Sequence, residues 1–139
     1  MRMRARFLLD TNICIYIRQK KAPEVMARFR TLEAGKVAMS VITQGELLYG
    51  AERSQQREVS MRALEELAAL IPPLALPEEA GAEYGRIRVD LERRELTIGN
   101  NDLWIAAHAK AGKFVLVTNN EKEFRRIGGL RVENWASRK

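Results

Sequence analysis

Short, continuous apolar runs alternate along the chain with longer segments of helical periodicity. The short runs are typical of buried strands, and they occupy residues 6–9, 37–40, 74–76, 114–117 and 131–133. The run 114–117 is Phe-Val-Leu-Val, which indicates a central parallel strand, whereas 131–133 indicates a strand at an edge.

Helical periodicity and helix-breaking residues divide the rest of the chain into seven predicted helices. Their expected first residues are Thr11 or Asn12, Pro23, Ser40 or Thr43, Val59, Pro77, Asp102 and Glu121. The helix from Pro77 is expected to be the longest, and Gly35 is expected to end the helix from Pro23. Strands that alternate with helices predict one α/β domain over residues 1–139, with a mainly parallel central sheet and helices on both faces.

In such sheets the ligand site lies beyond the carboxyl ends of the strands, and polar residues gather there in this sequence. Asp10-Thr11-Asn12 follows the first strand, Glu46 lies in the helix after the second, and Thr118-Asn119-Asn120 follows 114–117. Asp102 opens the helix that leads into 114–117, so the sheet rule alone leaves its place open.

Each of these acids also has a purely structural interpretation. Asp10 and Asp102 can be helix N-caps, and Glu46 can close a capping box with Thr43. Gly45 favours a site at Glu46, because glycine is costly inside a helix and a close backbone approach would explain it. If the three carboxylates converge, they repel one another unless a cation lies between them. Mg²⁺ prefers oxygen ligands and can activate water for attack on phosphorus.

The net charge and the single cysteine and histidine limit the reactions and partners that the sequence suits. The net charge is +6, from 24 Lys and Arg against 18 Asp and Glu; it suits a nucleic-acid partner, although solubility alone also explains it. Cys14 is the single cysteine, so no internal disulfide forms, in agreement with a cytoplasmic location. His108 is the single histidine and is expected to pack inside its helix, which disfavours cleavage by a pair of histidines.

Four segments, in order, resemble the motifs of PIN-domain VapC toxins. They are Leu8-Leu9-Asp10-Thr11-Asn12-Ile13, the run from Ser40 to Gly50, the run from Ile98 to Ala109, and Leu116 to Asn120 with Glu123-Phe124. The resemblance covers residues 7–135 and implies a PIN-like α/β/α sandwich. It also implies a homodimeric, Mg²⁺-dependent endoribonuclease, with Mn²⁺ as a substitute, that is the toxin of a toxin–antitoxin pair.

The resemblance also implies roles for individual residues. Asp10 and Asp102 would be the main metal ligands and Glu46 would position the metal or its attacking water. Thr11 and Asn12 would orient these carboxylates, and Asn120, where many relatives carry an acid, would complete the polar rim.

The implied partners are a VapB-type antitoxin, which would also bind operator DNA, and an RNA substrate such as the anticodon stem-loop of initiator tRNA. The candidate contacts to RNA phosphates, each of which is equally explained as part of a solvated helix face, are Arg86, Arg93, Arg94, Arg125 and Arg126. Glu123 is expected to cap or solvate the last helix rather than to replace the acid missing at Asn120.

Two other functions remain open from the sequence. An aspartyl phosphotransferase would use Asp10 as its nucleophile, but a second acid is typical two residues later, where this chain has Asn12. A PIN-like module that binds RNA or protein without cutting is the non-enzymatic alternative.

Overall fold

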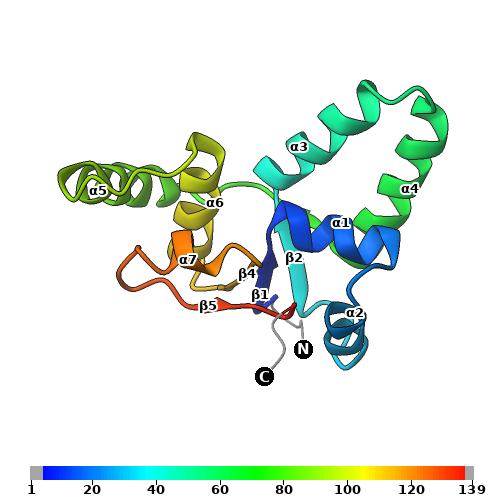
Figure 1. Ribbon diagram of the computed structural model, residues 1–139, viewed down its shortest axis with the longest axis horizontal. Helices are drawn as coiled ribbons and strands as arrows, with labels where there is room; N and C mark the ends of the chain where they lie inside the picture. The colour runs from blue at the N-terminus through cyan, green and yellow to red at the C-terminus, as the bar shows by residue number, and fades with distance from the viewer. Residues whose placement is uncertain (1–4, 137–139) are drawn as a thin grey trace.

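Five parallel strands form the central sheet of the protein, whose computed structural model describes residues 5–136 (Figure 1). The strands are β1 (Phe7–Leu9), β2 (Val37–Ser40), β3 (Pro73–Leu74), β4 (Val115–Val117) and β5 (Val132–Glu133), in the order β3-β2-β1-β4-β5. Every pair is parallel, so the predicted α/β fold is confirmed and β5 lies at an edge as expected. The strand order reverses between β1 and β4, which is where ligand sites form in open α/β sheets.

Helices connect the strands, and in the described part of the chain there are seven of them. They are α1 (Thr11–Gln19), α2 (Pro23–Arg30), α3 (Val41–Glu52), α4 (Arg57–Leu70), α5 (Ala80–Arg93), α6 (Asn100–Ala111) and α7 (Glu121–Phe124). None of these helices has the length and apolar character that crossing a membrane requires.

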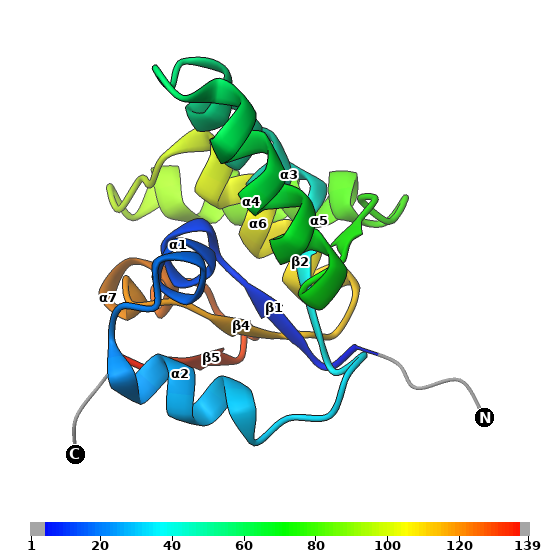
Figure 2. The same cartoon turned by 90° about the vertical axis from the view of Figure 1, so that its right-hand side faces the viewer.

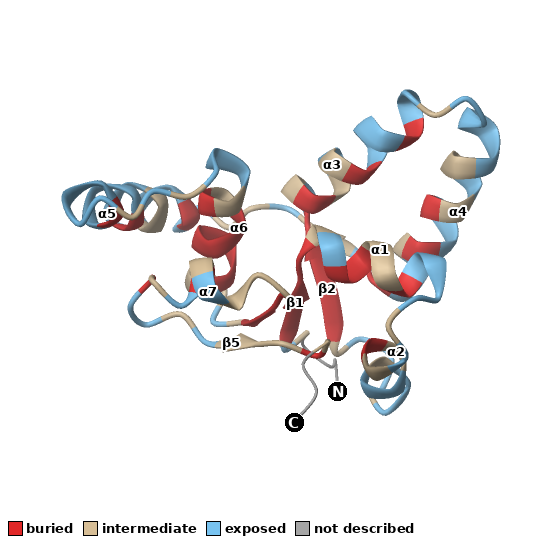
Figure 3. Ribbon diagram, in the orientation of Figure 1, coloured by how far each residue is buried: buried red, intermediate tan, exposed pale blue. Residues whose placement is uncertain are grey.

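The helices form two layers because successive strand residues point to opposite faces of the sheet. Leu8, Ala38 and Leu116 face one side, where they pack with α5, α6 and α7. The neighbouring residues of the same strands face the other side, where α1 to α4 cover them. Figures 1 and 2 show the sheet between these layers, and burial is concentrated in α6 and in the interior strands β1, β2 and β4, whereas β5 is intermediate (Figure 3).

Helices α3 and α4 form a hairpin that extends away from the sheet (Figures 1 and 2). Its far end is exposed, whereas Leu64 and Leu67 of α4 are buried near the sheet. The start of α3 therefore lies at the carboxyl end of β2, while most of the hairpin presents its surface to solvent.

Several helix boundaries differ from the predictions. Helix α4 begins at Arg57 rather than Val59, whereas α1 begins at Thr11 with Asp10 as its N-cap, as one interpretation predicted. The second helix already ends at Arg30, so Gly35, with φ 91°, shapes the loop before β2 instead of ending the helix. The helix expected from Pro77 begins at Ala80 and is no longer than α4. Propensity signals mark the region of a boundary but not its residue.

Truncation of a buried side chain in the interior strand β4 tests this packing. Leu116 is fully buried, so Leu116→Ala is expected to lower the free energy of unfolding by about 2–5 kcal/mol. The measurement is urea denaturation followed by circular dichroism. Leu70→Ala is the control, because Leu70 is 57% exposed and its loss should change stability by less than about 0.5 kcal/mol. Equal effects of the two substitutions would contradict the arrangement of the core.

Candidate functional site

Asp10 is held at the junction of β1, α1 and β4. Its Oδ1 accepts a hydrogen bond from the backbone N–H of Ile13 at 3.0 Å, which caps α1, and its own N–H donates to the Val117 carbonyl at 2.9 Å. The Thr118 hydroxyl also hydrogen-bonds its carboxyl group. Only 6% of Asp10 is exposed, so the carboxylate has little freedom to move. The two interpretations of Asp10 as cap and as site acid are therefore compatible.

Glu46 lies in α3 and contacts two other elements. Its Oε1 accepts from the Thr11 hydroxyl at 2.5 Å, and its Oε2 accepts from the Asn101 side-chain amide at 3.3 Å. Ser40 caps α3 by accepting from the Ile42 N–H, so the capping box predicted for Thr43 and Glu46 does not form. Thr11 thus orients a site carboxylate.

The predicted close backbone approach at Gly45 is absent from the described structure. A Cβ added at Gly45 would meet nothing within 4 Å, so no close backbone approach within the protein explains this glycine. Gly45 instead lines an open hollow of about 600 Å³. The other residues that line it are Val41, Ile42, Glu46, Tyr49 and Asn101. Glu46 is consequently accessible to a large ligand.

Asp102 lies in the first turn of α6 and is half-buried. Gly99 is the N-cap residue of this helix, so the interpretation of Asp102 as a cap is wrong. Farther along α6, the buried Nδ1 of His108 lies 2.8 Å from the Ser40 Oγ, and burial lowers the pKa of His108 to about 4. His108 therefore joins α6 to the start of α3, as expected for a packing residue.

Burial and neighbouring acids raise the pKa of Asp10 and of Asp102. Burial raises the pKa of Asp10 to about 6, and the charges of Asp102 and Glu46 add to this effect, while hydrogen bonds from Thr118 and Ile13 oppose it. Burial also raises the pKa of Asp102, with further contributions from Glu46 and Glu123. The sheet edge therefore brings together the three predicted acids.

Glu123 is a fourth acid near this edge of the sheet. Its charge contributes to the raised pKa of Asp102, after burial and Glu46. It lies in the first turn of α7, beside the buried Phe124. That Glu123 caps or solvates this helix stays a prediction.

Asp10, Glu46 and Asp102 do not form a three-ligand metal site in the described structure. Within residues 5–136, no three Asp, Glu, His or Cys side chains lie close enough to hold a metal ion together. Mg²⁺ commonly uses only one or two carboxylates and completes its coordination with water and phosphate. Because Asp10 is buried beside two other acids, a cation here would relieve an unfavourable accumulation of negative charge.

The remaining predicted residues contribute unequally. Asn12 is exposed, and its side chain has no hydrogen-bond partner among the described residues. The predicted hydrogen bond from Asn12 to a site carboxylate is therefore absent there. Asn120 is half-buried at the start of α7, where its N–H donates to the Thr118 hydroxyl. Its neighbour Asn119 donates to the Tyr16 hydroxyl at 2.7 Å, and its Oδ1 is buried without a partner in the described structure.

The arginines are partly neutralised by acids of their own helices. Three of the five pair with a neighbouring carboxylate: Arg86 with Glu83, Arg94 with Asp90, and Arg125 with Glu121. Arg94 also donates to the Arg126 carbonyl, which joins the end of α5 to the segment after α7. Arg93 is exposed, with no ion pair among the described residues, and is the most available to a phosphate.

A parallel α/β sheet with carboxylates from four elements at its carboxyl edge defines the class of protein. The PIN domain family model matches residues 7–130. The chain belongs to the PIN-domain family, in its VapC branch.

Curated relatives and solved structures match this chain over almost its whole length. The chain is 41% identical over 131 residues to the tRNA(fMet)-specific endonuclease VapC of Shigella flexneri, covering 94% of this chain and 98% of the relative. It is 39% identical over 130 residues to the ribonuclease VapC2 of Haemophilus influenzae, with the same coverage. The structure of VapBC2 from Rickettsia felis bound to a DNA fragment from its promoter matches with a TM-score of 0.86 at 38% identity, covering 93% of this chain and 98% of that one. DNA-bound VapBC from Salmonella typhimurium matches with a TM-score of 0.88 at 37% identity, covering 94% and 98%.

The raised pKa of Asp10 makes the stability of the metal-free protein depend on pH. The folded carboxyl group binds its proton more tightly than the unfolded one, so stability falls as the pH rises from about 4 to about 6. Above that range the ionised group costs on the order of 2–3 kcal/mol. Asn keeps the helix cap without the charge. In EDTA at pH 8, Asp10→Asn should therefore raise Tm by roughly 5–10 °C, a gain that shrinks toward pH 4.

Thermal denaturation followed by circular dichroism measures this difference. Glu66→Gln is the control, because Glu66 is exposed on α4 without an ion pair among residues 5–136, and the change should leave Tm nearly unaltered at every pH. A Tm gain for Asp10→Asn that does not vary with pH would show that ionisation of Asp10 is not the cause.

Proposed function

We propose that this protein is a metal-dependent endoribonuclease that acts as the toxin of a toxin–antitoxin pair. The observation that carries the proposal is that the charges of Glu46 and Asp102 both raise the pKa of the buried Asp10, although the three acids come from separate elements. A cluster of partly buried carboxylates lowers the stability of a fold, but it is a suitable site for a cation. The kinship with proteins named ribonucleases supports the same activity.

In this proposal Asp10 and Asp102 hold a divalent cation, Mg²⁺ or Mn²⁺. The bound cation would stabilise negative charge on the phosphate and lower the pKa of a nearby water. Glu46 is oriented by Thr11 and Asn101 and would align that water and accept its proton. Hydrolysis forms one bond from the water oxygen to phosphorus and breaks the bond to the leaving ribose oxygen, which gains a proton. Glu123 adds negative charge that favours retention of the cation near Asp102.

The proposed substrate is RNA, and specifically the anticodon stem-loop of initiator tRNA. The relative in Shigella flexneri is named for tRNA(fMet), which motivates this choice. The net charge of +6 would attract the RNA at long range. Arg93, which is free of ion pairs in the described structure, and the arginines at the end of α5 and after α7 would contact its phosphates.

The proposed partners follow from the matching complexes. We propose that a VapB-type antitoxin covers the carboxylate site at the sheet edge. We also propose that operator DNA is bound through the antitoxin, since two of the matching structures are DNA-bound VapBC. A homodimer that works in the cytoplasm completes the proposal.

The two alternatives fit the site less well. Asp10 is 6% exposed and both its hydrogen-bond donors hold it in place, which disfavours attack on a phosphodonor. Asn12, where a phosphotransferase would carry its second acid, is exposed and takes no part in the site. Binding without cleavage remains an outcome that the following assay distinguishes.

Cleavage of a synthetic anticodon stem-loop of initiator tRNA tests the proposal. The wild-type protein should cut it in Mg²⁺ or Mn²⁺ and not in EDTA. Asp10→Asn should reduce kcat/KM by more than roughly 100-fold, because it removes a direct ligand. Glu66→Gln, an equal change of charge on an exposed residue of α4, should leave the rate within about twofold. Retention of RNA on a filter without cleavage in any divalent metal would establish the binding module instead.

A further inference from the structure

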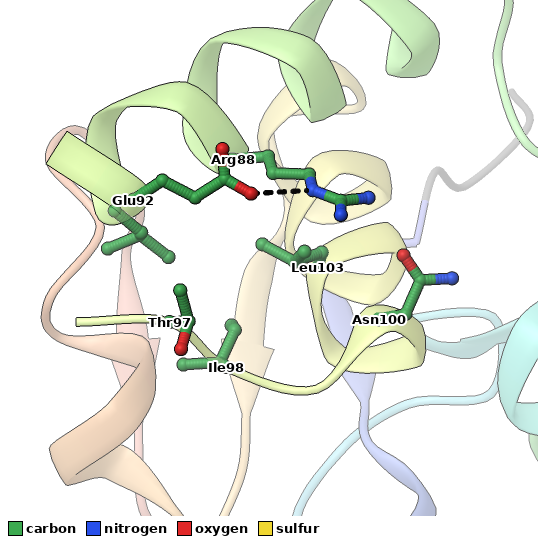
Figure 4. Close-up of a pocket in the computed structure, with 7 residues that line it drawn as sticks. Arg88, Glu92, Thr97, Ile98, Asn100 and Leu103 are labelled. Atoms are coloured by element: carbon green, nitrogen blue, oxygen red, sulfur yellow. Dashed lines mark hydrogen bonds and ion pairs between the residues drawn. The ribbon is translucent and has the colours of Figure 1, made fainter. Parts of the chain in front are cut away.

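A second, smaller hollow lies beside the helical turn that carries Asp102. It has a volume of about 100 Å³ and is bounded by the C-terminal half of α5, the segment at 97–98 and the first turn of α6. Figure 4 shows Arg88 and Glu92 of α5 facing Thr97 and Ile98 across it, with Leu103 between them. None of the five arginines considered above for RNA binding lines this hollow.

The hollow has an apolar floor and a rim that carries both charges. Leu91 and Leu103 are buried and form the floor together with Ile98. At the rim, the Arg88 Nε donates to the Glu92 Oε2 at 3.1 Å. The Glu92 carboxylate would repel a phosphate, so the rim suits a neutral ligand that presents both donors and acceptors.

The polar groups at the rim are held in place by an aromatic pair. The rings of Tyr84 and Trp104 are stacked, with centroids 4.0 Å apart and planes 16° from parallel. The Tyr84 hydroxyl donates to the Asn100 Oδ1 and accepts from the Arg88 Nη1 at 2.8 Å. Within residues 5–136 the Asn100 Nδ2 has no acceptor, so this amide is oriented and free to donate to a ligand.

The hollow and the carboxylate site share one turn of α6. Asn100 and Leu103 line the hollow, whereas Asn101 of the same turn donates to Glu46. Asp102 belongs to this turn as well, and one helical turn advances only about 5.4 Å along its axis, so a single nucleotide can span from the hollow to the carboxylate site.

We infer that this hollow receives one unpaired nucleobase of the RNA, adjacent to the cleaved phosphate. A base has flat apolar faces for the floor and an edge of donors and acceptors for Arg88, Glu92 and Asn100. Proteins that bind single-stranded RNA use such combinations of apolar contact and edge recognition. The inference rests on the proposed function and assigns to this hollow the choice of cleavage position.

Abasic RNA tests the inference directly. The probes are the initiator tRNA anticodon stem-loop and a series in which one loop nucleotide at a time lacks its base. For the wild-type protein, one position adjacent to the cleavage point should lower kcat/KM roughly tenfold or more when its base is removed. In Arg88→Gln and in Asn100→Ala, the loss at that position should shrink below about threefold, while losses at other positions persist. Arg62→Gln, an equal change on exposed α4, should retain the wild-type pattern.

The possible failures are distinguishable. Variants that lose activity equally on every probe, or that keep the full penalty at the sensitive position, would overturn the base site. An unchanged penalty together with a shift in size-exclusion chromatography would show that the hollow contacts protein instead. If the wild-type protein cuts none of the probes, the nuclease proposal itself fails, and the base site with it. Circular dichroism of each variant confirms that the fold is retained.

Discussion

Repulsion between carboxylates at one edge of the sheet is the constraint on which the rest of the structure depends. Asp10 is almost fully buried, and Asp102 and Glu46 lie near enough to raise its pKa further. Such an arrangement is unfavourable for the empty protein and becomes favourable when a cation is present. The fold therefore maintains at this edge a concentration of charge that its own stability does not require.

The surrounding elements resist the tendency of these acids to separate. Asp10 is fixed by α1 and β4, Glu46 by Thr11 and Asn101, and α6 is joined to the start of α3 through His108 and Ser40. These contacts connect segments that are far apart in sequence. A wholly parallel sheet makes them possible, because all its strands deliver their following residues to the same edge.

Much of this could be predicted from local sequence, and the failures have a common cause. Strands and helices follow from short-range periodicity, so the parallel sheet and its helices were predictable. Thr43 with Glu46 satisfied the capping pattern, but the hydroxyl that hydrogen-bonds Glu46 is that of Thr11, 35 residues away in the sequence. Periodicity within α7 likewise cannot reveal that Glu123 lies near enough to affect the pKa of Asp102. Local patterns identify candidate residues, and only the tertiary structure decides between their roles.

Calorimetric titration of the metal-free protein with Mg²⁺ or Mn²⁺ tests the shared-cation account most directly. Because the pKa of Asp10 is about 6, binding at pH 6 should release about half a proton, and binding at pH 8 almost none. Titrations in buffers of different ionisation enthalpy measure this release, and Asp10→Asn should abolish it and weaken binding at least tenfold. A variant that binds the cation as tightly as the wild-type protein, with the same proton release, would contradict the account.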